Sequence, residues 1–250
     1  MNGNLKLSVV IPSYNESAEL KKTSIDAVDT FLKLQNFSSE VLIIDDESTN
    51  ESLEVVRDYI KGKKNFKLIE NEHGGKAITV MTGMLEAKGE IRLFMDMDYA
   101  TPIEEINKFM PMFEEGFDIV IGSRHGRKGA PILRKIAAQG FVMLRNIILG
   151  LPLSDTQCGF KAMSYEATEK IFGQMLITWK KMRAKNAAVN AGFDVEMLFL
   201  AKKKGFKIAE VIVDWHHVQN EKQVQLLRDS VETIKDMFRI RLNDLQGKYS

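Results

Sequence analysis

Two aspartates, Asp96 and Asp98, stand one residue apart at the end of an apolar run from Ile91 to Met95. Side chains two residues apart on a strand point to the same face of a sheet. In open α/β sheets, ligands lie beyond the carboxyl ends of the strands. Neighbouring carboxylates at such a place offer the hard oxygen ligands that Mg²⁺ or Mn²⁺ prefers. We therefore predict a divalent-cation site at Asp96 and Asp98, the alternative being a solvated strand end.

Acidic side chains follow two other apolar runs. The run from Leu7 to Ile11 leads into Pro12-Ser13-Tyr14-Asn15-Glu16, and the run from Val41 to Ile44 ends in Asp45 and Asp46. Each motif alone is compatible with a turn or a helix cap. Parallel strands bring their carboxyl ends to one edge of a sheet, where crowded carboxylates need a cation or a hydrogen-bonding ligand. Together the three motifs favour a binding site at that edge.

The elements that must position these residues alternate along the chain, and they predict an α/β fold with a mainly parallel, Rossmann-like sheet flanked by helices in a single domain. We expect Pro12 to stop the first strand. The expected strands are 7–11, 41–44, 66–69, 91–95, 117–122 and 207–215, with a short strand after the loop 153–161. The expected helices are 16–34, 52–60, 75–87, one opened by Thr101-Pro102, 132–149, 165–172, 195–204 and an amphipathic helix 224–242.

Composition excludes several classes of protein. The 250 residues carry 35 basic and 34 acidic side chains, so no overall field favours nucleic acid. Cys158 is the single cysteine, which rules out an intramolecular disulfide and suits a small buried residue. No apolar run reaches the roughly 18 residues of a membrane span. A dinucleotide-dependent dehydrogenase is disfavoured because no G-x-G-x-x-G follows the first strand.

These motifs, in their order and spacing, resemble the family 2 glycosyltransferases of GT-A fold over roughly residues 5 to 216. The resemblance rests on the strand-end motifs above, Asn71-Glu72-His73-Gly74-Gly75-Lys76 and Asp96-Met97-Asp98. Within the family, Gly122-Ser123-Arg124, Asp155 to Lys161 and Phe193-Asp194-Val195-Glu196 are similar to dolichyl-phosphate glucosyltransferases, with the mannosyltransferases as near neighbours.

The resemblance implies a nucleotide-sugar donor, Mg²⁺ or Mn²⁺, and inversion at the anomeric carbon. Asp98 would be the direct metal ligand, with Asp96 contributing from the ribose side. Asp46 would accept a hydrogen bond from the base, and Lys76 would lie near the base or diphosphate. Ala100 occupies a position where several relatives carry a third ligand, which here would be water, His216 or His217. The full set of donor-binding residues is Pro12, Tyr14, Glu16, Asp45, Asp46, Lys76 and Asp96.

A phosphate acceptor is already anionic, so it needs positive charge more than a catalytic base. Arg124 is the first candidate to hold it. On a continuous helix Arg134 and Arg145 would share nearly the same face, and planar guanidinium groups suit bidentate phosphate capture. The resemblance adds Asp155, Gln157 and Lys161 on the acceptor side. Asp194 lies where a catalytic base would lie in relatives that use a hydroxyl acceptor.

A membrane surface is the expected partner of the second half. Apolar residues surround Arg145 on a helix with little polar face, which indicates burial or a lipid surface. Trp179, in a basic segment, would suit the interface. We expect peripheral association with the cytosolic face of a membrane from a cytoplasmic location, either weak or through a membrane-protein recruiter.

The sequence thus predicts an inverting, metal-dependent hexosyltransferase that moves glucose from UDP-glucose to a polyprenyl phosphate of the dolichyl type. Residues 1–125 would form the nucleotide-sugar-binding half and 126–250 the acceptor half of one catalytic domain. One alternative keeps the fold but uses GDP-mannose, and another uses a soluble hydroxyl acceptor with Asp194 as base. A third, from another class, is a non-catalytic protein that binds a nucleotide or a lipid head group.

Overall fold

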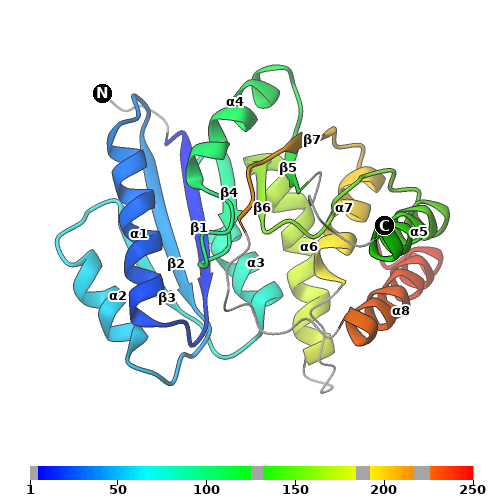
Figure 1. Ribbon diagram of the computed structural model, residues 1–250, viewed down its shortest axis with the longest axis horizontal. Coiled ribbons are helices and arrows are strands. Elements are labelled where there is room, and N and C mark those ends of the chain that lie inside the picture. The colour runs from blue at the N-terminus through cyan, green and yellow to red at the C-terminus, as the bar shows by residue number, and fades with distance from the viewer. Residues whose placement is uncertain (1–4, 125–131, 184–191, 217–225, 250) are drawn as a thin grey trace.

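The computed structural model describes residues 5–124, 132–183, 192–216 and 226–249. Their strands form one seven-stranded sheet in the order β3-β2-β1-β4-β6-β5-β7 (Figure 1). β6 runs antiparallel to both of its neighbours, and the other pairs are parallel. This confirms the predicted single α/β domain. The strands are β1 (Leu7–Ser13), β2 (Ser39–Asp45), β3 (Phe66–Glu70), β4 (Ile91–Met95), β5 (Ile119–Ser123), β6 (Phe160–Ser164) and β7 (Ile208–Ile212).

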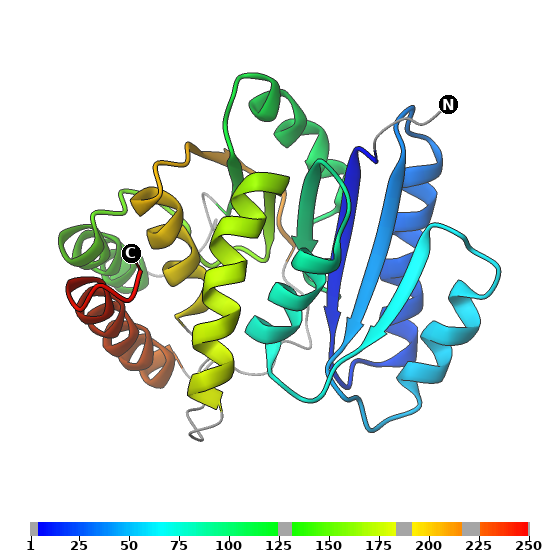
Figure 2. The same ribbon diagram turned by 180° about the vertical axis from the view of Figure 1, so that it is seen from behind.

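Helices cover both faces of the sheet, and alternate strand residues face the two layers (Figures 1 and 2). Val9 and Ile43 pack in the layer of α1, α2 and α4, whereas Val10 and Ile44 pack in the layer of α3, α6 and α7. Burial on both faces explains why the central strands read as continuous apolar runs. The helices are α1 (Ala18–Lys33), α2 (Ser52–Ile60), α3 (Lys76–Glu86), a 3₁₀ turn (Ile103–Glu105), α4 (Ile106–Glu114), α5 (Ile132–Leu149), α6 (Tyr165–Arg183), α7 (Phe193–Lys203) and α8 (Leu226–Leu245).

Two boundaries differ from the sequence-based expectation. β1 continues through Pro12 to Ser13. β4 pairs with β1 only from Leu7 to Val10, so at Pro12 the strand has a partner on one side and the missing N–H is tolerated there. α6 continues to Arg183 and so includes the start of the basic segment, which was not expected to be helical.

Trp179 is not at an interface, which corrects that expectation. Its side chain is buried against Phe193 with the two rings edge to face, and its indole N–H donates to the buried Glu196 at 3.3 Å. A tryptophan satisfied in this way belongs to the core. The side chains of the neighbouring residues 180–183 are outside the described part of the structure.

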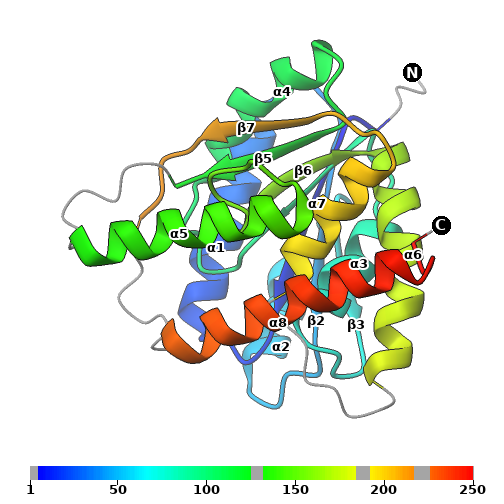
Figure 3. The same cartoon turned by 90° about the vertical axis from the view of Figure 1, so that its right-hand side faces the viewer.

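Beyond α7, the helices α5 and α8 pack against each other and close the end of the domain (Figure 3). In the other half of the sheet, a hydrogen bond from Asp46 N–H to the Ser13 carbonyl at 2.9 Å joins the carboxyl ends of β1 and β2. α3 begins at Lys76 on this same edge. The sheet therefore gathers the acidic strand ends where the sequence predicts a site.

Candidate active site

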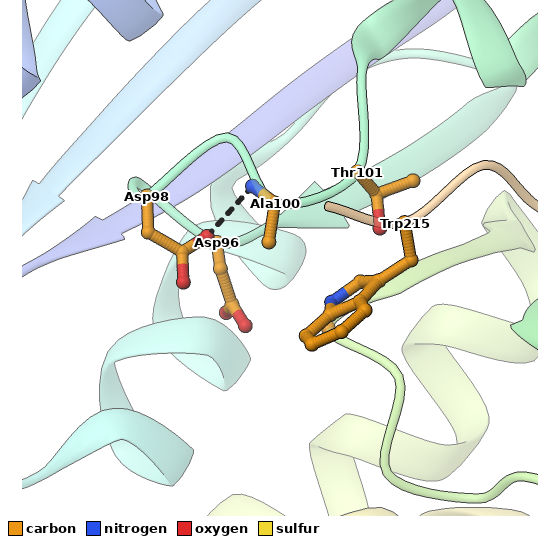
Figure 4. A pocket seen from close by; sticks show the side chains of 6 residues that line it. Asp96, Asp98, Ala100, Thr101 and Trp215 are labelled. Carbon is orange, nitrogen blue, oxygen red and sulfur yellow. Dashed lines mark hydrogen bonds between the residues drawn. The ribbon is translucent and has the colours of Figure 1, made fainter. Parts of the chain in front are cut away.

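Asp96 and Asp98 lie in the turn directly after β4, which ends at Met95. Figure 4 shows their carboxyl groups pointing toward the same open space. The backbone N–H of Ala100 donates to Asp98 Oδ1 at 3.0 Å and orients that side chain. The shared direction thus comes from the turn, and not from the strand alternation that the sequence suggested.

A pocket opens beside this turn and draws its walls from three distant parts of the chain. The segment after β7 joins the turn through a hydrogen bond from His216 N–H to the Ala100 carbonyl at 2.8 Å. The loop before β6 contributes Gly159. The residues that line the pocket are Asp96, Asp98, Ala100, Thr101, Gly159 and Trp215 (Figure 4).

Lys76, the first residue of α3, places its ammonium 2.6 Å from Asp96 Oδ1. Gly75 precedes it with φ 77°, a backbone conformation that favours glycine. Desolvation lowers the pKa of the Lys76 ammonium, but the charges of Asp96, Asp194 and Asp98 outweigh it and raise that pKa above its ordinary value. Lys76 is therefore held in its charged form beside Asp96.

The two carboxylates fit a Mg²⁺ or Mn²⁺ ion that shares its remaining ligands with a substrate. Mg²⁺ is commonly held by one or two carboxylates together with phosphate oxygens and water. Within the described residues no group of three His, Cys, Asp or Glu side chains gathers to form an all-protein site. His216 is exposed next to the turn, and His217 lies outside the described residues, so the third ligand stays a prediction.

Arg124 and Asp155 form a bidentate pair next to Trp215, one of the residues that line the pocket. The guanidinium donates from Nε to Asp155 Oδ2 at 2.6 Å and from Nη2 to Oδ1 at 2.9 Å, and it lies over the Trp215 ring at 5.8 Å. Burial raises the pKa of the Asp155 carboxyl, but the hydrogen bonds and charge of Arg124 outweigh burial and lower that pKa to about 2. The pair is fixed in geometry and in charge.

Asp194 is held by Lys161. The Lys161 ammonium lies 2.6 Å from Asp194 Oδ1 and also donates to the Cys158 carbonyl. No part of the Lys161 side chain is exposed, which differs from the expected contact with an acceptor phosphate. Lys161 acts on the site through Asp194. Gln157 is exposed, and its backbone N–H donates to Asp155 at 3.0 Å; its contact with an acceptor stays a prediction.

Arg145 is buried, which corrects its expected role as a ligand of the acceptor. Its guanidinium donates to Thr156 Oγ1 at 3.0 Å and to the carbonyls of Leu151 and Leu153. With these acceptors Arg145 holds the loop that carries Asp155. Arg134 also belongs to α5, and its side chain falls outside the described residues.

Asp45 and Asp46, the second acidic motif, are paired with other groups of the protein. Asp45 is buried, lies 3.7 Å from the Lys21 ammonium and accepts from Ser48. Asp46 accepts from Gly74 N–H at 2.7 Å and from Gly75 N–H at 2.9 Å, with only 3% of its side chain exposed. These bonds hold the loop that leads into α3 and Lys76. A direct bond from Asp46 to a base stays a prediction.

Pro12, Tyr14 and Glu16 lie at the end of β1 as the resemblance implies, and their contacts with a nucleotide stay predictions. Tyr14 is 38% exposed, and its ring centroid lies 4.7 Å from that of His73. His73 Nδ1 is also 3.0 Å from Asp46 Oδ2. The pair forms an exposed aromatic surface beside the acidic edge.

Three residues shape the site although no sequence-based prediction assigned them a role. Gly159 and Trp215 line the pocket. Glu210 of β7 accepts from the backbone N–H groups of Ser154 and Asp155 at 2.9 and 2.7 Å, and so anchors the loop of the ion pair. The signal for Glu210 is weak, since an acid on an edge strand usually faces solvent.

Comparison with known proteins identifies relatives along most of the chain. The family described as glycosyl transferase family 2 matches residues 8–172. A dolichyl-phosphate beta-glucosyltransferase of Dictyostelium discoideum is 32% identical, covering 98% of this chain and 76% of the relative. The protein of the same description in Saccharomyces cerevisiae is 31% identical, covering 97% and 76%.

Solved structures share the fold. Mannosyl-3-phosphoglycerate synthase from Rubrobacter xylanophilus superposes with a TM-score of 0.70 at 15% identity, over 98% of this chain and 75% of that one. Glucosyl-3-phosphoglycerate synthase from Mycobacterium tuberculosis, in complex with Mn²⁺, UDP and glucosyl-3-phosphoglycerate, gives 0.64 at 18% identity, over 94% and 80%. The family match extends over more than half of the chain and includes the Asp96-Met97-Asp98 turn, and the chain therefore belongs to glycosyl transferase family 2.

Proposed function

We propose that this glycosyltransferase moves glucose from UDP-glucose to a polyprenyl phosphate of the dolichyl type, with inversion at the anomeric carbon. The observation that carries the proposal is the convergence of Asp96 and Asp98 on one pocket with Lys76 beside them. The relatives named dolichyl-phosphate beta-glucosyltransferases support the sugar and the acceptor. The mycobacterial complex with UDP and Mn²⁺ supports the nucleotide and the metal.

On the donor side, Asp96 and Asp98 would hold Mg²⁺ or Mn²⁺ together with the diphosphate oxygens. When bound, this cation neutralises the negative charge that develops on the departing nucleoside diphosphate. Lys76 adds a second positive charge next to Asp96. The start of α3 favours anionic groups as well, because a helix N-terminus carries a partial positive charge.

On the acceptor side, Arg124 would hold the phosphate. Asp155 occupies two of the five N–H donors of the guanidinium and fixes its plane, which leaves the remaining donors for a second anion. A phosphate monoester is ionised near neutral pH, so the enzyme need not remove a proton before attack. A phosphate oxygen then bonds to the anomeric carbon as the bond from that carbon to UDP breaks, which inverts the configuration.

The outer surface of α5 supports peripheral membrane association. Met143 and Ile147 lie one turn apart on this helix and are 66% and 71% exposed, while Arg145 points inward to the loop of Asp155. Amphipathic helices that bind membranes insert such an apolar face into the boundary between the lipid head groups and the acyl chains. α5 therefore links the proposed phosphate site to a lipid-facing surface.

Of the helices that the structure describes, none has the length and hydrophobicity that crossing a bilayer requires. A location on the cytosolic face of the membrane is part of this proposal.

The test of the reaction is a panel of radiolabelled nucleotide-sugars offered with a polyprenyl phosphate and Mn²⁺. We expect label from UDP-glucose, and not from GDP-mannose, to enter the organic phase. Transfer from GDP-mannose would identify a mannosyltransferase. Label that moves only to a water-soluble hydroxyl acceptor would overturn the lipid acceptor. Neither transfer nor hydrolysis with any donor would favour a binding protein without catalysis.

The test of the membrane surface is flotation with vesicles that contain polyprenyl phosphate. The double variant Met143→Glu/Ile147→Glu should lose flotation. Leu34→Glu is a matched control, because Leu34 is 77% exposed and directly follows α1, a helix at the opposite end of the domain from α5 (Figure 1). Equal flotation of the double variant and the wild type would contradict this role of α5, and no flotation of the wild type would contradict peripheral association.

A further inference from the structure

Gly159 lies against the carboxylate of Asp96. A Cβ atom at Gly159 would be 1.9 Å from Asp96 Oδ2 and 2.4 Å from Cγ, where real Cβ contacts are not shorter than 3.0 Å. No residue with a side chain at position 159 is compatible with this orientation of Asp96. The contact joins the loop before β6 to the turn after β4.

The sheet explains why the two residues meet. Met95, the last residue of β4, pairs with Phe160, the first residue of β6, in antiparallel register. Asp96 and Gly159 are the next residues outward on the two chains, where opposing Cβ atoms in a sheet would stand about 4.5–5.5 Å apart. Asp96 instead folds its carboxylate back over the space that a side chain at 159 would fill. In this position Asp96 Oδ1 reaches Lys76 at 2.6 Å.

The backbone does not require the glycine. Gly159 has no positive φ, whereas Gly62, Gly75 and Gly116 do. The three atoms nearest to its Cβ position all belong to the Asp96 side chain, so an alanine would meet no backbone and no core residue at these distances. The space at Gly159 therefore serves the carboxylate and not the fold.

We propose that Gly159 is a positioning residue for the donor site, whose missing side chain sets the direction of the Asp96 carboxylate toward Lys76 and the pocket shared with Asp98. This inference rests on the proposed function, since it assigns Asp96 to the metal and diphosphate of a nucleotide-sugar. With alanine at 159, Asp96 turns away and the two carboxylates no longer face one ion. The effect on ligand binding is then confined to the metal-dependent binding of the nucleotide.

The experiment compares UDP binding by calorimetry, with and without Mn²⁺, in the wild type, Gly159→Ala and Gly173→Ala. Gly173 is the matched control because nothing lies within 4 Å of a Cβ at this position in α6. We expect Gly159→Ala to weaken binding in Mn²⁺ by about 10- to 100-fold, the range seen when partners of metal ligands are displaced. Binding without Mn²⁺ should change little, and Gly173→Ala should bind as the wild type does.

A double-mutant cycle of melting temperatures distinguishes the loss of this one contact from a general loss of stability. Gly159→Ala should lower the melting temperature in the wild-type background and not in an Asp96→Ala background, because the clash is with that side chain alone. An equal loss in both backgrounds, or equal affinity for UDP with Mn²⁺ in Gly159→Ala and the wild type, would overturn the inference and leave the proposed function standing. A wild type that binds no UDP with Mn²⁺ would overturn both.

Discussion

The Lys161 ammonium lies 2.6 Å from Asp194 Oδ1, and it comes from a side chain with no exposed surface. β6 carries the lysine and the first turn of α7 carries the aspartate, so this ion pair joins the sheet to the helix layer beside the pocket. A buried charge of this kind is costly when its partner is removed.

Replacement of Lys161 by methionine should therefore damage both folding and catalysis. We expect Lys161→Met to lower the free energy of unfolding by about 3 kcal/mol, since Asp194 loses its partner. Transfer should fall on the order of a hundredfold, because the displaced Asp194 no longer acts with its charge on Lys76. Urea unfolding and initial rates measure the two effects.

The double variant Lys161→Met/Asp194→Leu is the control. Replacing both members of a buried ion pair by apolar residues is often neutral for stability. The double variant should recover most of the stability and none of the activity. Full stability of the single variant would show that Asp194 does not depend on this lysine.

Asp155 should make folding sensitive to acid. Its pKa lies at about 2 in the folded protein against an ordinary value of 3.8, so the native state binds its proton less tightly than the unfolded chain. The ionised pair contributes about 2 kcal/mol at a pH above the unfolded value. This contribution is lost as the pH falls from 3.8 through 2.

The variant Asp155→Asn tests this dependence. It should be less stable than the wild type near neutral pH, and the difference should shrink below about pH 4. Urea unfolding at a series of pH values measures the difference. A gap between the two proteins that stays constant with pH would mean that Arg124 does not stabilise an ionised Asp155.

The fold and the acidic edge could be predicted because they depend on local patterns. Apolar runs that end in acidic residues predicted that Asp46 and Asp96 lie at strand ends. The alternation of strands with helices predicted the mainly parallel sheet. The position of β6 was not predictable in this way. The chain inserts this antiparallel strand between β4 and β5, and only that pairing brings Gly159 opposite Asp96.

The predicted environments of two side chains, Arg145 and Trp179, were wrong for a related reason. The spacing along α5 correctly describes a helix with apolar and basic residues, but it does not say which face turns inward. The loop after α5 supplies the acceptors that draw Arg145 into the interior. Trp179 packs against Phe193 of another helix, and Glu196 of that helix accepts from its indole N–H. Contacts between distant segments determine where both side chains lie, and helical periodicity does not predict such contacts.

Arg145 should be essential for the loop that it holds. We expect Arg145→Met to lower the free energy of unfolding by about 2–4 kcal/mol, because the carbonyls of Leu151 and Leu153 and the Thr156 hydroxyl lose a charged donor. The KM for the acceptor should rise more than the KM for the donor, since the loop carries Asp155.

The neighbouring residue provides the control for Arg145. Asn146 is exposed on the same helix, and Asn146→Ala should change stability by less than about 0.5 kcal/mol. Equal effects of the two substitutions would contradict the role of Arg145 in the loop. A larger rise in the KM for the donor would mean that the loop serves the nucleotide side of the pocket.

Asp98 offers the sharpest test of the catalytic site. Asp98→Ala removes a carboxylate that lines the pocket and accepts from Ala100 N–H, and the loss of that hydrogen bond should lower the free energy of unfolding by about 1 kcal/mol. Transfer should fall by more than about a hundredfold, because the metal loses its direct ligand. Circular dichroism and the transfer assay measure the two effects, with Asp58→Ala, an exposed carboxylate of α2, as control. Normal turnover of Asp98→Ala would contradict a metal-dependent mechanism. The remaining carboxylate, Asp96, is already paired with Lys76 and would not hold the ion by itself.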